Sequence, residues 1–123
     1  MDIEDMMRAD TFMPFATDPR GYTVLCSERQ MEKVYAHHPE LVNFWATEHD
    51  IKLAISQAQF IYQSIKGKAF NVYYRSRVGK NTELKVIVKF NEDKVGILWA
   101  AQPSAVGQRK PGETVLWPIL MKP

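Results

Sequence analysis

The alternation of apolar and polar side chains over residues 83–90, which only Ile87 interrupts, constrains the fold more than any other feature of this sequence. Successive side chains of a strand point to opposite faces, so this pattern is typical of a strand that is buried on one side. The apolar face carries Leu84, Val86, Val88 and Phe90, and the other face carries Lys85, Ile87 and Lys89. The segment therefore predicts a strand in a sheet with one core face and one cationic face.

The rest of the second half of the chain also has the pattern of strands separated by turns. Strands are predicted at 70–77, 95–101 and 114–117, turns at 78–81 and 91–94, and a polar loop at 103–113. Because residues 95–101 are nearly all apolar, they predict an interior strand. Pro118 ends the last strand, which we expect at an edge of the sheet.

Helical spacing replaces alternation in the first half of the chain. Ser27 is a typical N-cap for a helix over 28–37, and Thr47 with Asp50 predicts the start of another. Pro39 fits the first turn of a short helix between them, over 39–45. Short strands are predicted at 22–26 and 60–65, and residues 1–20 lack a long apolar period and are predicted to form an arm.

This order of elements predicts an α+β fold in which the N-terminal helices pack on one face of an antiparallel sheet. We expect a single domain over residues 21–123, preceded by the arm at 1–20. The composition agrees, because 46% hydrophobic and 24% charged residues in a 123-residue chain exclude collagen, coiled coil and wholesale disorder.

The sequence also predicts the compartment of the protein and the absence of a disulfide, a zinc site and a membrane span. No apolar run approaches the ~18 residues of a membrane span, and the acidic N-terminus does not resemble a secretory signal. The single cysteine, Cys26, cannot form an internal disulfide and is predicted to be a core residue. One cysteine and three histidines do not fit a four-ligand zinc site. We therefore expect a cytoplasmic protein with no cofactor and no membrane partner.

Charge is unevenly distributed along the chain. Residues 66–94 hold eight basic and three acidic side chains, although the net charge is only +2. A basic segment that alternates with apolar residues can present a cationic sheet face, which suits a polyanion such as RNA. The alternative interpretation is an ordinary solvated strand face.

The sequence His37-His38-Pro39-Glu40 places two imidazoles and a carboxylate at a helix corner. Histidine can act as acid or base near neutral pH, and a neighbouring carboxylate can orient its ring. The alternative is structural, with His38 hydrogen-bonded in the core and His37 exposed to solvent.

The predicted hairpin offers groups that suit a phosphodiester. Tyr74 can stack on a base, Arg75 has a fork that matches phosphate oxygens, and Lys85 and Lys89 are compact charges. Cleavage by a 2′-hydroxyl needs a base, an acid and cations around the developing charge, and it needs no metal. The alternative is that this face only keeps the protein soluble.

The order of these motifs over about residues 24–103 resembles the phage-associated barnase–EndoU–colicin–RelE-like (BECR) nuclease domains. The motifs are His-Pro-Glu after a short helix, Tyr-Tyr-Arg, Leu-Lys-Val-Ile-Val-Lys, and an apolar strand that ends before a proline. The resemblance implies helices against a curved antiparallel sheet. It also implies metal-independent RNA cleavage to a 2′,3′-cyclic phosphate, by a toxin or a phage protein.

Residue by residue, the resemblance gives a site. Its predicted catalytic residues are His38, Tyr74, Arg75 and Lys85, and its predicted RNA-binding residues are Lys33, His37, Arg77 and Lys89, with no metal. RNA is the expected partner, together with an antitoxin, an immunity protein or a host protein.

Two departures from the family pattern keep alternatives open. Lys33 stands where the family often has a histidine, and Ala100 and Gln102 stand where it often has a hydroxyl and a phenol. Loss of a positioned acid or base typically costs about 10²–10⁴ in rate. The alternatives are an inactive BECR-like module that binds nucleic acid or a host protein, and an assembly protein whose apolar arm exchanges between subunits.

Overall fold

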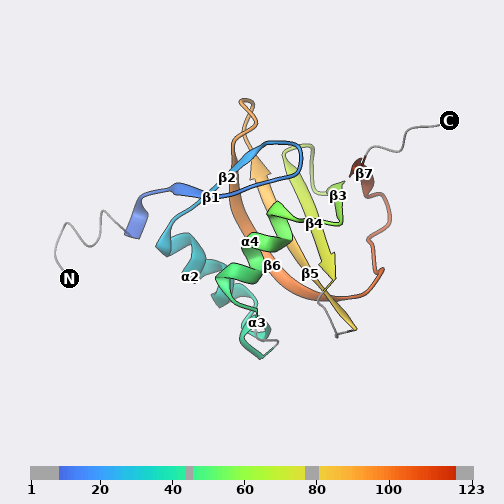
Figure 1. The fold of residues 1–123 in the computed structure, drawn as a ribbon, viewed down its shortest axis with the longest axis horizontal. Coiled ribbons are helices and arrows are strands. Elements are labelled where there is room, and N and C mark those ends of the chain that lie inside the picture. Colours follow the sequence, from blue (N-terminus) through green and yellow to red (C-terminus); the bar gives the residue numbers. More distant parts are fainter. Residues whose placement is uncertain (1–8, 44–45, 77–80, 119–123) are drawn as a thin grey trace.

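The computed structural model describes residues 9–43, 46–76 and 81–118, which form an α+β fold around one curled sheet (Figure 1). The sheet has seven strands in the order β1-β2-β6-β5-β4-β3-β7. The strands are β1 (Met13–Thr17), β2 (Thr23–Cys26), β3 (Phe60–Gln63), β4 (Phe70–Ser76), β5 (Thr82–Phe90), β6 (Gly96–Ala105) and β7 (Thr114–Trp117). The helices are α2 (Glu28–His37), α3 (Glu40–Asn43) and α4 (Glu48–Ser56). The predicted α+β class is thus confirmed.

The sheet is mixed, so the prediction of a purely antiparallel sheet was wrong. Strand β2 runs parallel to β6, with Val24 opposite Gly96 and Leu25 opposite Ile97. The direction of this pairing depends on how the chain returns after the helices, and side-chain alternation carries no information about that. The remaining neighbours are antiparallel, and β4, β5 and β6 form the expected meander.

The segment predicted as an arm contributes a strand to the sheet. Residues Met13–Thr17 form β1, which pairs with β2 at the edge of the sheet. Asp18, directly after β1, is buried. Part of the predicted arm therefore belongs to the folded body, and the exchange of a free arm has no support from these residues.

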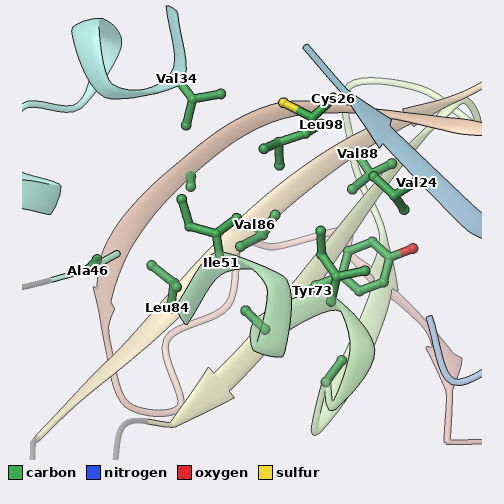
Figure 2. Close-up of a cluster of buried hydrophobic side chains, with 14 of the residues drawn as sticks. Val24, Cys26, Val34, Ala46, Ile51, Tyr73, Leu84, Val86, Val88 and Leu98 are labelled. Atoms are coloured by element: carbon green, nitrogen blue, oxygen red, sulfur yellow. The ribbon is translucent and has the colours of Figure 1, made fainter. Parts of the chain in front are cut away.

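The core lies between the helices and the apolar face of the sheet (Figure 2). Leu84, Val86 and Val88 of β5 are buried there, as the alternation predicted. Helix α4 places Ile51 against them, and α2 contributes Val34. Cys26 is also buried in this core, and its burial raises the pKa of the thiol to about 11. Its predicted role as a core residue is confirmed.

The two longer helices begin at the predicted caps. The Ser27 hydroxyl accepts a hydrogen bond from the backbone of Gln30, and Thr47 and Asp50 form a reciprocal capping box. The side chain of Gln30 also donates to the backbone oxygen of Leu98 at 2.8 Å. This bond attaches α2 to β6. Strand β6 is the neighbour of β5 in the sheet, so α2 lies close to the cationic side chains of β5.

Strand β6 contains a bulge that changes the direction of its side chains. Ile87 is opposite Ala100 and Val88 is opposite Leu98, so Trp99 is the extra residue. Leu98 is buried in the core, whereas Trp99 and Ala100 both line a pocket outside it. A bulge next to a site commonly redirects a side chain in this way.

Candidate functional site: a lysine-lined pocket

The face of the sheet that carries Lys85 lies opposite the core, and we call it the outer face. Three side chains are in register across it, because Tyr74 of β4 is opposite Lys85 of β5, and Lys85 is opposite Gln102 of β6. Ile87 and Ala100 form the next pair. The predicted cationic face of β5 is therefore next to residues of two neighbouring strands.

A pocket of about 490 Å³ opens where α2 meets the outer face, and we call it the lysine pocket. Its lining residues are Gln30, Lys33, His37, His38, Lys66, Phe70, Lys85, Ile87, Trp99, Ala100, Gln102 and Lys110. They include four lysines and two histidines, and none of these lining residues is acidic. Pockets of this size accept small-molecule ligands, and the charge of this one favours an anion.

Lys85 differs from the other lysines of the pocket because it is buried, with only 5% of its surface exposed. Among the described residues, its ammonium has no hydrogen bond and no ion pair, and it lies 6.0 Å from the centre of the Tyr74 ring. Burial, together with Lys110, Lys66 and Arg109 nearby, lowers the pKa of Lys85, although Glu113 acts in the opposite direction. The side chain is buried but its Nζ keeps accessible surface, so the ammonium faces the pocket without a counter-charge from the described residues at ion-pair distance.

His38 is held by the carboxylate that follows it in the chain. Its Nδ1 lies 2.8 Å from Oε1 of Glu40, and this contact lowers the pKa of the Glu40 carboxyl. With Nδ1 bonded to the carboxylate, Nε2 is the nitrogen left to accept a proton. The His38 side chain is 30% exposed, so the alternative of a core histidine was wrong. His37, exposed at the end of α2, lines the same pocket.

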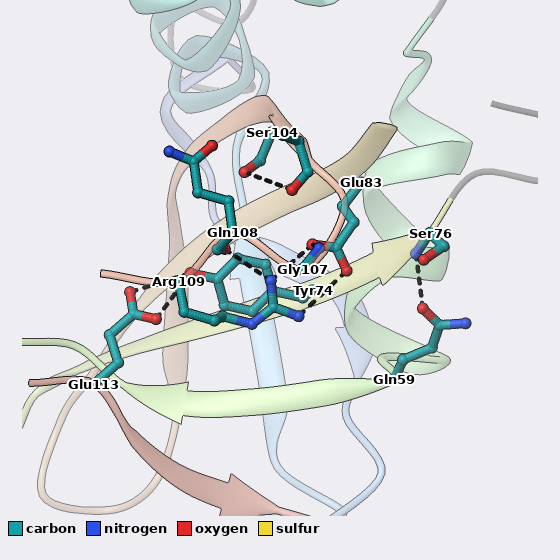
Figure 3. A network of polar contacts seen from close by, with 10 residues as sticks. Gln59, Tyr74, Ser76, Glu83, Ser104, Gly107, Gln108, Arg109 and Glu113 are labelled. Carbon is teal, nitrogen blue, oxygen red and sulfur yellow. Dashed lines mark hydrogen bonds and ion pairs between the residues drawn. The ribbon is translucent and has the colours of Figure 1, made fainter. Parts of the chain in front are cut away.

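Tyr74 is next to the pocket but is covered by the chain itself. Only 1% of its surface is exposed, and its hydroxyl donates to Glu113 at 2.9 Å. The Arg109 guanidinium lies 3.6 Å from the centre of its ring and pairs with both oxygens of Glu83 (Figure 3). Burial and Glu113 raise the pKa of Tyr74, so the phenol stays protonated. Tyr74 therefore anchors the loop that brings Lys110 to the pocket, and its own contacts are internal.

Arg75 points away from the lysine pocket. Its Nη1 donates to the backbone oxygen of Gln57, at the end of α4 on the other face of the sheet. Tyr74 and Arg75 are consecutive in a strand, so they cannot share a face. The structure does not bring Arg75 to this site, and Arg77 lies outside the described residues.

Lys89 lies further along the outer face, beside the aromatic end of the lysine pocket. Its ammonium is 5.1 Å from the centre of the Trp99 ring and 5.7 Å from that of Phe70. Both rings line the pocket, although Lys89 does not. The structure thus gathers His37, His38, Lys33 and Lys85 in one pocket and places Lys89 beside it.

Two cations of the pocket were missed by sequence reasoning. Lys66 follows β3 and Lys110 belongs to the loop before β7, so both are far in sequence from Lys85. Lys66 was visible only as part of the basic segment, and no sequence signal marked Lys110. The pairing of Arg109 with Glu83 fixes the loop that carries Lys110, and Lys66 reaches the pocket from the segment between β3 and β4.

A second buried polar cluster lies at the turn after β1. Oδ2 of Asp18 accepts hydrogen bonds from Nε and Nη2 of Arg20, and it also accepts one from the Tyr73 hydroxyl at 2.7 Å. Arg20 donates further to Asn71 at 2.8 Å. Burial and the Asp18 carboxylate raise the pKa of Tyr73, so it remains a donor. We call these residues the Asp18 cluster.

Comparison of the chain with protein-family models, curated proteins and solved structures finds no match. Within the described ranges, no helix has the length and apolar character needed to cross a membrane.

Proposed function

We propose that the chain is a metal-independent ribonuclease that binds an RNA phosphate in the lysine pocket and cleaves the strand by attack of the 2′-hydroxyl. The observation that carries this proposal is Lys85, a buried side chain whose ammonium faces the pocket without an ion-pair partner among the described residues, next to three more lysines. A phosphodiester supplies the missing charge, and a partly buried site strengthens its attraction to the ammonium.

The two histidines favour cleavage over binding alone. In the proposed reaction, Nε2 of His38 takes the proton of the 2′-hydroxyl, with Glu40 orienting the ring. The O2′–P bond forms, the P–O5′ bond breaks, and protonated His37 gives a proton to the leaving O5′. Lys85 stabilises the charge that develops on the phosphorus oxygens. The products are a 2′,3′-cyclic phosphate and a free 5′-hydroxyl.

The positions that carried the family resemblance support this assignment. His38 and Lys85 line the pocket, and so do the residues that depart from the family pattern, Lys33, Ala100 and Gln102. A relationship to the BECR nuclease domains, and a toxin or phage setting with a protein inhibitor, are part of the proposal. Tyr74 and Arg75 are bonded to other residues of the chain, so we assign proton donation to His37 and phosphate binding to the lysines of the pocket.

The test is cleavage of total RNA in EDTA by the wild-type protein, His38→Ala and His49→Ala prepared identically. His49 is an exposed histidine outside the pocket, so it is the matched control. We expect wild type and His49→Ala to cleave equally, and His38→Ala to lose about 10²–10⁴ in rate. Equal cleavage by His38→Ala would remove His38 from the mechanism.

A second candidate function is RNA binding without cleavage. It is favoured by Ala100 and Gln102, which line the pocket where the family pattern has a hydroxyl and a phenol. Absence of cleavage, together with salt-dependent RNA binding that Lys85→Met abolishes and Arg75→Ala leaves intact, would establish this function instead. If neither cleavage nor binding is found at low salt, RNA is not the ligand, and a protein partner becomes the next hypothesis.

A further inference from the structure

We propose that Trp99 stacks on a nucleobase of the bound strand, which makes single-stranded RNA the substrate class of the lysine pocket. This inference rests on the proposed function, because it assumes that the pocket holds an RNA phosphate. It adds the recognition of a base to the recognition of charge.

The direction of Trp99 is the first observation. The β6 bulge makes it the extra residue between Leu98 and Ala100, and it lines the lysine pocket together with Ala100. Regular alternation would put only one of these two neighbours on the outer face. Because Leu98 is in the core, Trp99 faces outward by alternation, and the bulge places the small Ala100 on the same face beside it.

The exposure of Trp99 is the second observation. Although it is next to the core, 46% of its surface is exposed. Phe70 packs edge-on against it, with ring centres 5.8 Å apart and planes at 70°. This contact fixes the indole while leaving surface accessible, so little ordering is needed when a flat ligand binds.

The surrounding charge is the third observation. The ammonium of Lys89 lies 5.1 Å from the centre of the indole ring, and the four pocket lysines lie on the other elements around the same cavity. An aromatic ring beside a cationic groove is the usual arrangement for single-stranded nucleic acid, in which bases stack on rings while phosphates meet cations. Bases inside a duplex are already stacked and present no free face to Trp99.

The experiment compares two probes that differ only in their bases. One is a hexamer of 2′-O-methyl uridine, which resists cleavage because it has no free 2′-hydroxyl. The other is an abasic phosphodiester hexamer with the same charge. Affinities are measured for the wild type, Trp99→Phe, Trp99→Leu and Lys85→Met, with Phe12→Ala as an exposed aromatic control outside the pocket.

We expect the wild type to bind the uridine hexamer more tightly than the abasic one. Trp99→Leu keeps apolar volume but has no flat ring, so it should bind the uridine hexamer about 10-fold more weakly and the abasic hexamer unchanged. Trp99→Phe should retain most of the affinity, and Phe12→Ala all of it. The indole emission that Trp99→Phe lacks should be quenched by the uridine hexamer alone.

Other outcomes overturn the inference in distinguishable ways. If Trp99→Leu weakens both probes equally, or neither, Trp99 does not stack on a base, while the proposed phosphate site stands as long as Lys85→Met weakens both. If the wild type binds neither probe, or if Lys85→Met changes nothing, the proposed function fails and the inference fails with it. Thermal unfolding of each variant identifies any loss that comes from misfolding.

Discussion

Two buried polar clusters lie on opposite faces of the same sheet, and they differ in how their charges are balanced. In the Asp18 cluster, the carboxylate is fully buried and accepts hydrogen bonds from Arg20, from Tyr73 and from two backbone amides. In the lysine pocket, the buried side chain of Lys85 has no ion pair among the described residues. The charges of one cluster are paired with one another, whereas the ammonium of the other is not paired within the described ranges.

The Asp18 carboxylate has hydrogen-bond and ion-pair partners within the fold, as expected of a charge that stabilises the structure. The Lys85 ammonium has none among the residues that the structure describes, as expected of a charge kept for binding. A satisfied cluster joins the turn after β1 to β4 and is costly to break. An unsatisfied ammonium costs stability, and such groups are found mainly where function needs them. The contrast predicts that substitutions in the two clusters change stability in opposite directions.

The largest expected effect comes from breaking the complete cluster. Asp18→Ala leaves the Arg20 guanidinium and the Tyr73 hydroxyl without their acceptor, so we expect the free energy of unfolding to fall by about 3–5 kcal/mol. Urea denaturation measures this change. The control is Asp10→Ala, because Asp10 forms an exposed pair with Arg29 at 3.1 Å and should contribute less than about 1 kcal/mol. Similar losses in both variants would contradict the comparison.

The next effect concerns the loop that brings Lys110 to the pocket. Arg109→Met leaves the Glu83 carboxylate buried and unpaired, so the free energy of unfolding should fall by about 2 kcal/mol. RNA affinity should fall as well, because the loop loses its anchor. The double variant with Glu83→Gln should recover much of the stability but not the affinity, since it removes the unpaired charge without restoring the anchor. A double variant that restored both would show that the pairing has no positioning role.

A smaller effect, of opposite sign, is expected in the lysine pocket. Lys85→Met removes a buried charge but keeps the length of the side chain, so the protein should become more stable by about 1 kcal/mol while its RNA affinity falls. Lys66→Met is the matched control, because Lys66 is exposed and should change stability little. Destabilisation by Lys85→Met would mean that the ammonium is satisfied in the free protein.

The smallest effect is a pH dependence. The pKa of Lys85 is lowered in the folded protein, so the unfolded chain binds this proton more tightly. From the folded pKa up to the ordinary value of about 10.4, the unfolding free energy should therefore rise with pH in the wild type relative to Lys85→Met. RNA affinity should fall over the same range as the ammonium loses its proton. Denaturation and binding curves at increasing pH measure both trends. If the stability of the wild type and of Lys85→Met changes with pH in parallel, the pKa of Lys85 is not lowered by folding.

The sequence was informative wherever structure depends on neighbouring residues. The alternation at 83–90 predicted the buried face of β5, and Ser27 and Thr47 marked the helix starts. The same period of two places Tyr74 and Arg75, which are adjacent in β4, on opposite faces of the sheet. A motif of consecutive residues in a strand therefore does not by itself indicate a shared site.

Features that depend on distant segments were not predictable in this way. The parallel pairing of β2 with β6 and the bulge at Trp99 are set by how the whole chain packs. The approach of Lys110 to Lys85 depends on the pairing of Arg109 with Glu83. His38, His37 and Lys33 were predictable because they lie close together in sequence on one helix and its corner.

The span of the lysine pocket along the chain has a consequence for its biosynthesis. The lining residues run from Gln30 to Lys110, so all of this stretch must be made before the pocket can close. At the usual rate of synthesis, the later of these residues follows the earlier by roughly 4 to 16 seconds. A ribosome making this protein therefore carries an unfinished pocket for that time, and the emerging chain gains its full cationic site only after Lys110 has been added.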